Sequence, residues 1–171
     1  MADEYWYQVW GPPRRAGGRP DLTVIVPELL VGEYPTPDDV AWLRSEHGVT
    51  AVLSLQDDAD LGSKGLRLRD LERAYVANAL QFRRIPVPDC DNDILAARLD
   101  ASIAVLRAWH AEGGRVYLHC NAGMNRAPTV AIAYLHVVHG LPLLEARDFV
   151  KQRRYCVPYM RVLESHFHAA R

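Results

Sequence analysis

Cysteine is scarce in this sequence. The 171 residues include only three cysteines, Cys90, Cys120 and Cys156. Their number is odd, their spacing is wide, and a chain of this length can bury enough core to fold without disulfides. These features exclude the disulfide framework of a small secreted protein. We therefore expect a cytoplasmic protein whose cysteines stay reduced.

Long hydrophobic runs and an excess of one charge are also missing. No stretch approaches the roughly 18 consecutive apolar residues of a transmembrane helix, and the first residues, which include Asp3 and Glu4, lack the apolar core of a signal peptide. Lys and Arg number 20 against 21 Asp and Glu, so the formal net charge is -1. This balance provides no general attraction to nucleic acid or to an acidic membrane surface. We therefore expect a soluble monomer with no nucleic-acid or membrane partner, in which any anion site is local.

One stretch, residues 11–20, is rich in proline and glycine, with three of each in ten positions. Such a composition favours an irregular segment over a packed helix or strand. We expect residues 1–20 to form an N-terminal arm and residues 21–171 to form one domain. Four aromatic residues of the arm are expected either to pack on the domain or to bind a sugar or a partner. They are Tyr5, Trp6, Tyr7 and Trp10.

Downstream of the arm, short β-branched runs alternate with longer amphipathic runs. This pattern predicts an α/β fold with a central, mostly parallel sheet of about four or five strands flanked by helices. The predicted strands are residues 23–26, 29–32, 50–54, 82–87 and 116–119. The predicted helices are a segment that opens at residues 36–39 and stops at Gly48, followed by residues 67–77, 94–112, 127–138, 143–153 and 158–169.

The segment most informative about chemistry runs from the strand at residues 116–119 into Cys120 and, after five further residues, into Arg126. If the residues in between curl into a loop, their backbone N–H groups converge at the positive end of the following helix and form a nest for a phosphate. The same donors favour the thiolate form of Cys120, which is then nucleophilic at neutral pH. The predicted nest is made by Asn121, Ala122, Gly123, Met124, Asn125 and Arg126.

Three side chains of this loop have distinct expected roles. Arg126 offers two parallel donors to two phosphate oxygens, which a lysine cannot do. Gly123 permits a backbone conformation and a close approach that a side chain would obstruct. His119 is expected to anchor the loop through hydrogen bonds and to influence the acidity of the sulfur.

A phosphate ester also needs a proton for its leaving oxygen, and three carboxylates lie in a predicted loop upstream of the nest. They are Asp89, Asp91 and Asp93. Asp93 is expected to cap the helix that follows. We choose Asp89, 31 residues before Cys120, as general acid, and Asp91 is the alternative.

The spacing His119-Cys120-x-x-Gly123-x-x-Arg126, with an acidic loop upstream, resembles the protein tyrosine phosphatase superfamily in its small dual-specificity branch. Within that branch, further motifs resemble the plant starch-excess glucan phosphatases. They are Val31-Gly32 followed by Thr36-Pro37-Asp38-Asp39-Val40, then Leu55-Gln56-x-Asp58-x-Asp60-Leu61, Cys120-x-Ala-Gly-Met-x-Arg-Ala-Pro, and Arg154-x-Cys156-x-Pro158. The resemblance covers about residues 21–165.

The resemblance implies a two-step mechanism with a phosphocysteine intermediate and without metal or cofactor. It supports Cys120 as nucleophile, Arg126 as phosphate-binding group and Asp89 as general acid. The expected substrates are proteins carrying phosphotyrosine and phosphoserine or phosphothreonine. A phosphorylated carbohydrate is the alternative substrate, and a module that binds a phosphorylated ligand with weak or no turnover is a second alternative.

Two neighbours of these residues carry further expectations. Ala127 occupies the position at which most protein-directed relatives place Ser or Thr to stabilise the departing thiolate, and Thr129 lies about 200° around the helix from it. We therefore expect slow breakdown of the phosphoenzyme. Cys90 follows the proposed acid and is either a redox partner of Cys120 or a small half-buried residue.

Overall fold

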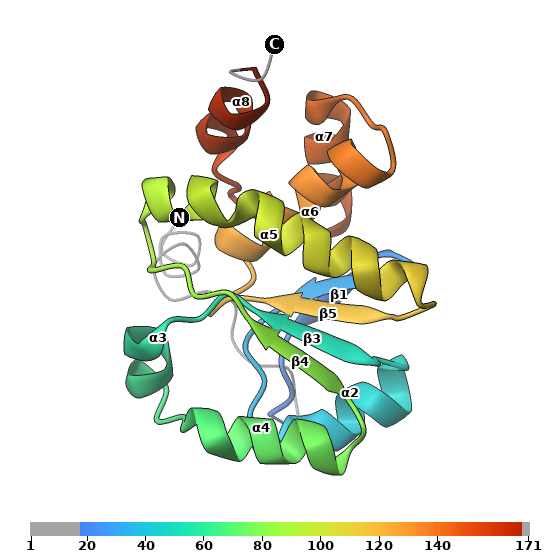
Figure 1. The fold of residues 1–171 in the computed structure, drawn as a ribbon, viewed down its shortest axis with the longest axis vertical. Helices are drawn as coiled ribbons and strands as arrows, with labels where there is room; N and C mark the ends of the chain where they lie inside the picture. Colours follow the sequence, from blue (N-terminus) through green and yellow to red (C-terminus); the bar gives the residue numbers. More distant parts are fainter. Residues whose placement is uncertain (1–17, 169–171) are drawn as a thin grey trace.

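The computed structural model describes residues 18–168, which form one twisted sheet with helices on both faces (Figure 1). The strands are β1 (Leu22–Val26), β2 (Leu29–Gly32), β3 (Ala51–Ser54), β4 (Gln81–Arg84) and β5 (Val116–His119). They are ordered β1-β2-β5-β3-β4. Strand β1 pairs with β2 in antiparallel fashion, and the other neighbours are parallel. The predicted α/β fold with a five-stranded, mostly parallel sheet is therefore confirmed.

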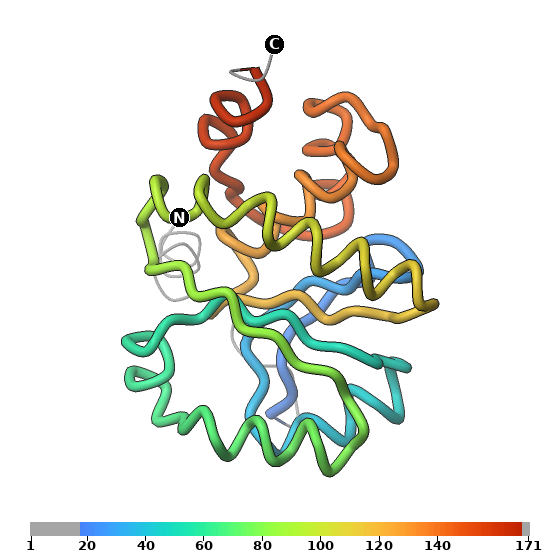
Figure 2. Tube along the Cα trace, viewed as in Figure 1, coloured from blue at the N-terminus to red at the C-terminus, as the bar shows by residue number. Residues whose placement is uncertain are grey.

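The helices divide into two groups. On one side of the sheet are the 3-10 helix η1 (Pro37–Asp39), α2 (Val40–His47), α3 (Asp58–Ser63) and α4 (Leu68–Ala77). On the other side are α5 (Asn92–Ala111), α6 (Arg126–Val138), α7 (Leu143–Arg153) and α8 (Met160–His168). Figure 2 shows the same path as a tube, with the chain leaving the sheet after β5 to enter α6.

Alternating side chains of the central strands supply two hydrophobic cores. In β2, Leu29 and Val31 join the core under α5 and α6, whereas Leu30 joins the core under α2 and α4. In β5, Leu118 belongs to the first core and Tyr117 to the second. Successive side chains of a strand point to opposite faces, so a sheet covered on both faces needs apolar residues at every position. The unbroken apolar runs of these strands meet that need.

Helix α6 lies at the centre of the larger core. Its residues from Arg126 to Leu135 are all buried, as expected of a helix whose sequence is apolar nearly all round. It packs against α5, α7 and α8. The start of α6, where the predicted nest lies, is therefore fixed by the most tightly enclosed helix among residues 18–168.

The helices and strands begin and end close to the predicted residues, except that one strand, β4, ends early. Strand β4 ends at Arg84 rather than at residue 87, yet Ile85 and Val87 still donate backbone hydrogen bonds to Ser54 and Leu55 at 2.9 and 3.0 Å. Pro86, between them, has no N–H to donate. The chain therefore stays beside β3 although the regular strand has ended.

Two features of the fold differ from the sequence prediction. Helix α3 was not predicted; it begins with a capping box in which Asp57 accepts a hydrogen bond from the Asp60 amide at 2.8 Å. The predicted cap of α5 was wrong, because Asp91, and not Asp93, accepts the hydrogen bond from the Ile94 amide, at 2.9 Å. The aromatic residues of the arm and residues 1–17 lie outside the described residues.

Candidate active site

The carboxyl ends of β3, β4 and β5 meet at one edge of the sheet, at the left of Figure 1. The chain continues from β5 into the loop of residues 120–125, from β4 into the loop that carries Asp89, and from β3 toward α3. Open parallel sheets bind ligands at this edge. The structure thus brings the predicted nucleophile, arginine and acid loops to the same place.

The backbone of the loop after Cys120 is held from its outer side. The Tyr34 amide donates to the Asn121 carbonyl at 2.9 Å, and the Val157 amide donates to the Met124 carbonyl at 2.8 Å. The guanidinium of Arg154 donates from Nη2 to the Ala122 carbonyl at 3.0 Å and from Nε to the Gly123 carbonyl at 2.7 Å. Within the described part of the chain, the N–H groups of residues 121–125 donate to no other group. Fixed carbonyls with unpaired amides are the arrangement expected of an anion nest.

Gly123 is required at its position for two reasons. Its φ of +65° lies in the left-handed region, which favours glycine. A Cβ there would lie 2.5 Å from the carbonyl oxygen of Gly32 and 2.7 Å from Nη2 of Arg154. Any side chain would push the loop off both contacts.

Arg154 braces the loop and was not singled out by the sequence as a functional residue. Its side chain is 2% exposed. Besides the two loop carbonyls, it donates from Nη1 to Asp21 Oδ2 at 2.9 Å and to Thr23 Oγ1 at 3.2 Å. The guanidinium therefore ties the loop to β1. The only signal in the sequence was its place in the motif shared with the starch-excess phosphatases.

Arg126 is 2% exposed, and both terminal nitrogens of its guanidinium donate to Asp60. Nη1 donates to Asp60 Oδ2 at 2.6 Å and to the Val87 carbonyl at 2.7 Å. The buried Nε makes no hydrogen bond in the described structure. Burial acts to lower the pKa of Arg126, but the interactions with Cys120, Asp60 and Asp89 raise it by more. The pKa of Arg126 therefore lies above its ordinary value. A permanently charged guanidinium whose Nε still lacks a hydrogen bond is suited to binding a dianion.

Asp60 supports Arg126 and the loop at the same time. It lies in α3, and its side chain is 8% exposed. Its Oδ1 accepts a hydrogen bond from Asn121 Nδ2 at 2.6 Å, and Gln56 Nε2 donates to Asn121 Oδ1 at 2.8 Å. Burial acts to raise the pKa of Asp60, but the hydrogen bond and charge of Arg126 outweigh it, so the pKa is lowered. The sequence reasoning named this residue only as part of a motif.

Cys120 and His119 lie at the start of the loop. Cys120 is 3% exposed and unbridged. Nδ1 of His119 donates to the Cys120 carbonyl oxygen at 3.1 Å, which places the ring proton on Nδ1 because a carbonyl can only accept. Burial, the largest cause, lowers the pKa of His119 to about 4. A neutral imidazole therefore anchors the loop at the peptide that follows the nucleophile.

The structure distinguishes Asp89 from Asp91, two of the three candidate acids. Oδ1 of Asp89 lies 3.5 Å from Nε of Arg126, and its side chain is 57% exposed. The side chain of Asp91 is occupied as the cap of α5. Asp89 is thus the carboxylate that lies beside the proposed phosphate-binding group and can also reach solvent.

Cys90 adopts an unusual backbone conformation next to Asp89, with a φ of +61°. Cys90 is exposed rather than half-buried. The hydroxyl of Tyr159 donates to Cys90 Sγ at 3.9 Å. The redox pairing with Cys120 stays a prediction.

Among residues 18–168, no group of three or more His, Cys, Asp or Glu side chains is arranged to hold a metal ion. No helix in the same range is both long and apolar enough to cross a membrane.

A family sequence model described as "Dual specificity phosphatase, catalytic domain" matches residues 31–165. The chain belongs to this family. The match includes the loop of residues 120–125, Arg126 and the segment with Asp89, and it confirms the resemblance inferred from the motifs.

Among curated proteins, the chain is 37% identical over 144 residues to the "Phosphoglucan phosphatase DSP4, amyloplastic" of Castanea sativa, covering 82% of this chain and 38% of that protein. It is 33% identical over 130 residues to "Dual specificity protein phosphatase 2" of Mus musculus, covering 76% and 36%. The chain thus spans under two fifths of the length of these relatives.

Among solved structures, the chain resembles the active form of Tk-PTP with a TM-score of 0.74 and 22% identity, covering 86% of this chain and 96% of that one. This similarity supports the fold.

Proposed function

We propose that the chain hydrolyses phosphate monoesters through a phosphocysteine intermediate, with both phosphotyrosine and phosphoserine or phosphothreonine as substrates. One observation carries the proposal. The buried Nε of Arg126 and the amides of residues 121–125 make no hydrogen bond in the described structure, next to a cysteine at a strand end. Buried donors normally find partners. A phosphate dianion bound against Cys120 would satisfy them together.

In the first step, Sγ of Cys120 attacks the phosphorus atom in line with the leaving oxygen. Arg126 and the loop amides hold the three non-bridging oxygens, where charge is concentrated in the transition state. As the P–O bond breaks, Asp89 gives its proton to the leaving oxygen. The products are a free alcohol or phenol and phosphocysteine.

In the second step, Asp89, now a carboxylate, takes a proton from a water that attacks the phosphorus atom. The S–P bond breaks, inorganic phosphate leaves, and Cys120 returns as a thiolate. The residues named supply the nucleophile, the positive charge and the proton transfer, so the proposed cycle needs no cofactor.

Turnover of p-nitrophenyl phosphate by the wild-type chain and by Cys120→Ser tests this function. We expect activity in the wild type and its loss in the variant. Cys156→Ser is the matched control, because it makes the same replacement at a buried cysteine outside the loop and should remain active. Equal activity of Cys120→Ser and the wild type would refute the proposal.

A glucan phosphatase is the second candidate, favoured by the 37% identity to a protein named as a phosphoglucan phosphatase. Kinetics measured side by side on a phosphotyrosine peptide, a phosphoserine peptide and phosphorylated glucan separate the two candidates. A kcat/KM for phosphorylated glucan well above those for both peptides would replace the first proposal with this one.

A module that binds a phosphorylated ligand with weak or no turnover is the remaining alternative, and an inactive but phosphate-binding wild type would support it. We also propose that the protein is a cytoplasmic monomer, on the composition of the chain and its three unbridged cysteines.

A further inference from the structure

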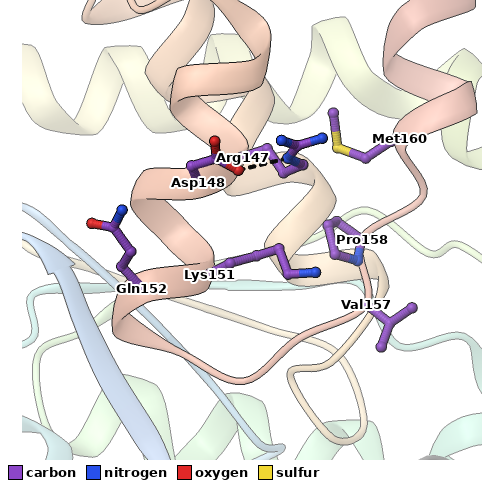
Figure 3. A pocket seen from close by; sticks show the side chains of 7 residues that line it. All are labelled: Arg147, Asp148, Lys151, Gln152, Val157, Pro158 and Met160. Atoms are coloured by element: carbon purple, nitrogen blue, oxygen red, sulfur yellow. Dashed lines mark hydrogen bonds and ion pairs between the residues drawn. The ribbon is translucent and has the colours of Figure 1, made fainter.

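A groove lies between α7 and the segment that leads into α8, and of its lining residues only Val157 belongs to the site described above. Its volume is about 510 Å³. It is lined by Arg147, Asp148, Lys151, Gln152, Val157, Pro158 and Met160 (Figure 3). Below, this is called the α7 groove.

One wall of the α7 groove is attached directly to the phosphate-binding loop. Val157 donates its backbone N–H to the Met124 carbonyl at 2.8 Å, and its own carbonyl accepts from Asn125 Nδ2 at 2.7 Å. Two residues on, the Tyr159 amide donates to Thr129 Oγ1 of α6 at 2.8 Å. The wall is therefore fixed to the rim of the nest, and the groove and the nest are neighbours.

The other wall carries an excess of positive charge. Arg147 is neutralised by Asp148, whose Oδ1 lies 2.8 Å from its Nε. Lys151 has no carboxylate within ion-pairing distance among residues 18–168, and Figure 3 shows its side chain extending from α7 toward Pro158. One unpaired ammonium thus faces the apolar surfaces of Val157 and Pro158.

We propose that the α7 groove binds acidic residues that flank the phosphorylated residue of a peptide substrate. This inference rests on the proposed phosphatase function and specifies its substrate. A carboxylate would pair with Lys151, while aliphatic parts of the peptide would contact Val157, Pro158 and Met160. The seven lining residues include no aromatic ring on which a sugar could stack and no carboxylate besides the paired Asp148, which favours an acidic peptide over a glucan.

The test uses two phosphotyrosine peptides of equal length, one with glutamates and one with glutamines beside the phosphotyrosine. The readout is the ratio of kcat/KM for the acidic peptide to that for the neutral one. Each ratio is measured on a single preparation, so partial misfolding cancels. Lys151→Glu is compared with Arg69→Glu, which makes a similar charge reversal on an exposed residue of α4 across the sheet.

We expect the wild-type chain to prefer the acidic peptide, and Lys151→Glu to lower the ratio about fivefold, the scale of one exposed ion pair. Arg69→Glu should leave the ratio near the wild-type value, and 1 M salt should abolish the preference, since the Debye length is then only about 3 Å. The groove proposal would be overturned if Lys151→Glu had the same ratio as the wild type, or if Arg69→Glu lowered the ratio as much as Lys151→Glu.

Turnover of p-nitrophenyl phosphate by the wild type separates the two proposals. If the wild type hydrolyses this small ester but shows no preference for the acidic peptide, the groove proposal is wrong and the phosphatase function stands. If it hydrolyses neither the ester nor the peptides, the phosphatase function fails, and the groove proposal fails with it. A preference for phosphorylated glucan over both peptides would also overturn the groove.

Discussion

At the residue scale, the site depends on buried side chains that do not themselves react. Asp60 and the Val87 carbonyl fix the guanidinium of Arg126, whose Nε is left without a hydrogen bond. Arg154 turns two loop carbonyls outward and so leaves the loop amides free. Geometry imposed by such neighbours is a large part of the catalytic effect of an enzyme.

Asp60→Asn is predicted to lower kcat/KM about 10- to 100-fold and to destabilise the fold by about 1–3 kcal/mol at pH 7, the scale of a hydrogen bond between charged groups. The lowered pKa of Asp60 in the fold gives the sign of the pH dependence. Its carboxylate stabilises the protein above the ordinary Asp range and loses this effect as the pH falls below about 4. Urea unfolding of both proteins at pH 7 and at pH 3 measures the difference, which should shrink at the lower pH. A difference that does not change with pH would contradict the role of the charge.

Arg154→Lys is predicted to lower kcat/KM about 10- to 100-fold, because an ammonium cannot donate to Ala122, Gly123 and Asp21 at once. Because the loss concerns the shape of the nest, affinity for vanadate should fall by a similar factor. Titration with vanadate, alongside thermal unfolding, separates this role from general stability. A variant that unfolds earlier but binds vanadate as tightly as the wild type would show that Arg154 acts only on stability.

At the scale of elements, the sequence predicted most of the fold but not how the elements support the site. Short β-branched runs located the five strands, and the spacing from Cys120 to Arg126 indicated the loop of residues 120–125 as the site. Helix α3 was missed because it has six residues, including Gly62, and so too few positions for an amphipathic pattern. The Asp57-x-x-Asp60 capping box was its one local signal.

The roles of Asp60 and Arg154 depend on contacts far apart in the sequence. Asp60 lies 66 residues from Arg126, and Arg154 lies 31 residues from Gly123. Local patterns carry no information about such contacts. The choice between Asp93 and Asp91 as the cap of α5 likewise needed the structure, since either aspartate fits the sequence pattern of a helix cap.

The first turn of α6 offers no hydroxyl to the departing thiolate. Ala127 is fully buried, and Thr129 Oγ1 donates to the Asn125 carbonyl at 2.7 Å and accepts from the Tyr159 amide. We therefore expect slow breakdown of phosphocysteine, with a burst of p-nitrophenol before the steady rate in stopped-flow experiments. Ala127→Ser should raise the steady rate and reduce the burst. Linear release from the first turnover would contradict this expectation.

At the scale of the whole molecule, the nest lies where the central helix of the larger core meets the sheet. A dianion bound there contacts only the folded chain and should stabilise all of it. At 100 times its Kd, vanadate should add about 2.7 kcal/mol, or about 5–10 °C in Tm for a domain of this size. Arg126→Met should lose the shift. A shift of equal size in this variant would place the anion elsewhere.

The central claim is that the amides of residues 121–125 and Arg126 hold a phosphoryl group against Cys120. Rapid acid quenching during turnover, followed by peptide mass spectrometry, tests it most directly. We predict phosphate covalently attached to Cys120, in larger amount when the second step is slowed by Asp89→Asn and a substrate with a good leaving group is used. Turnover without any phosphorylated Cys120, or with the phosphate on another residue, would contradict the account.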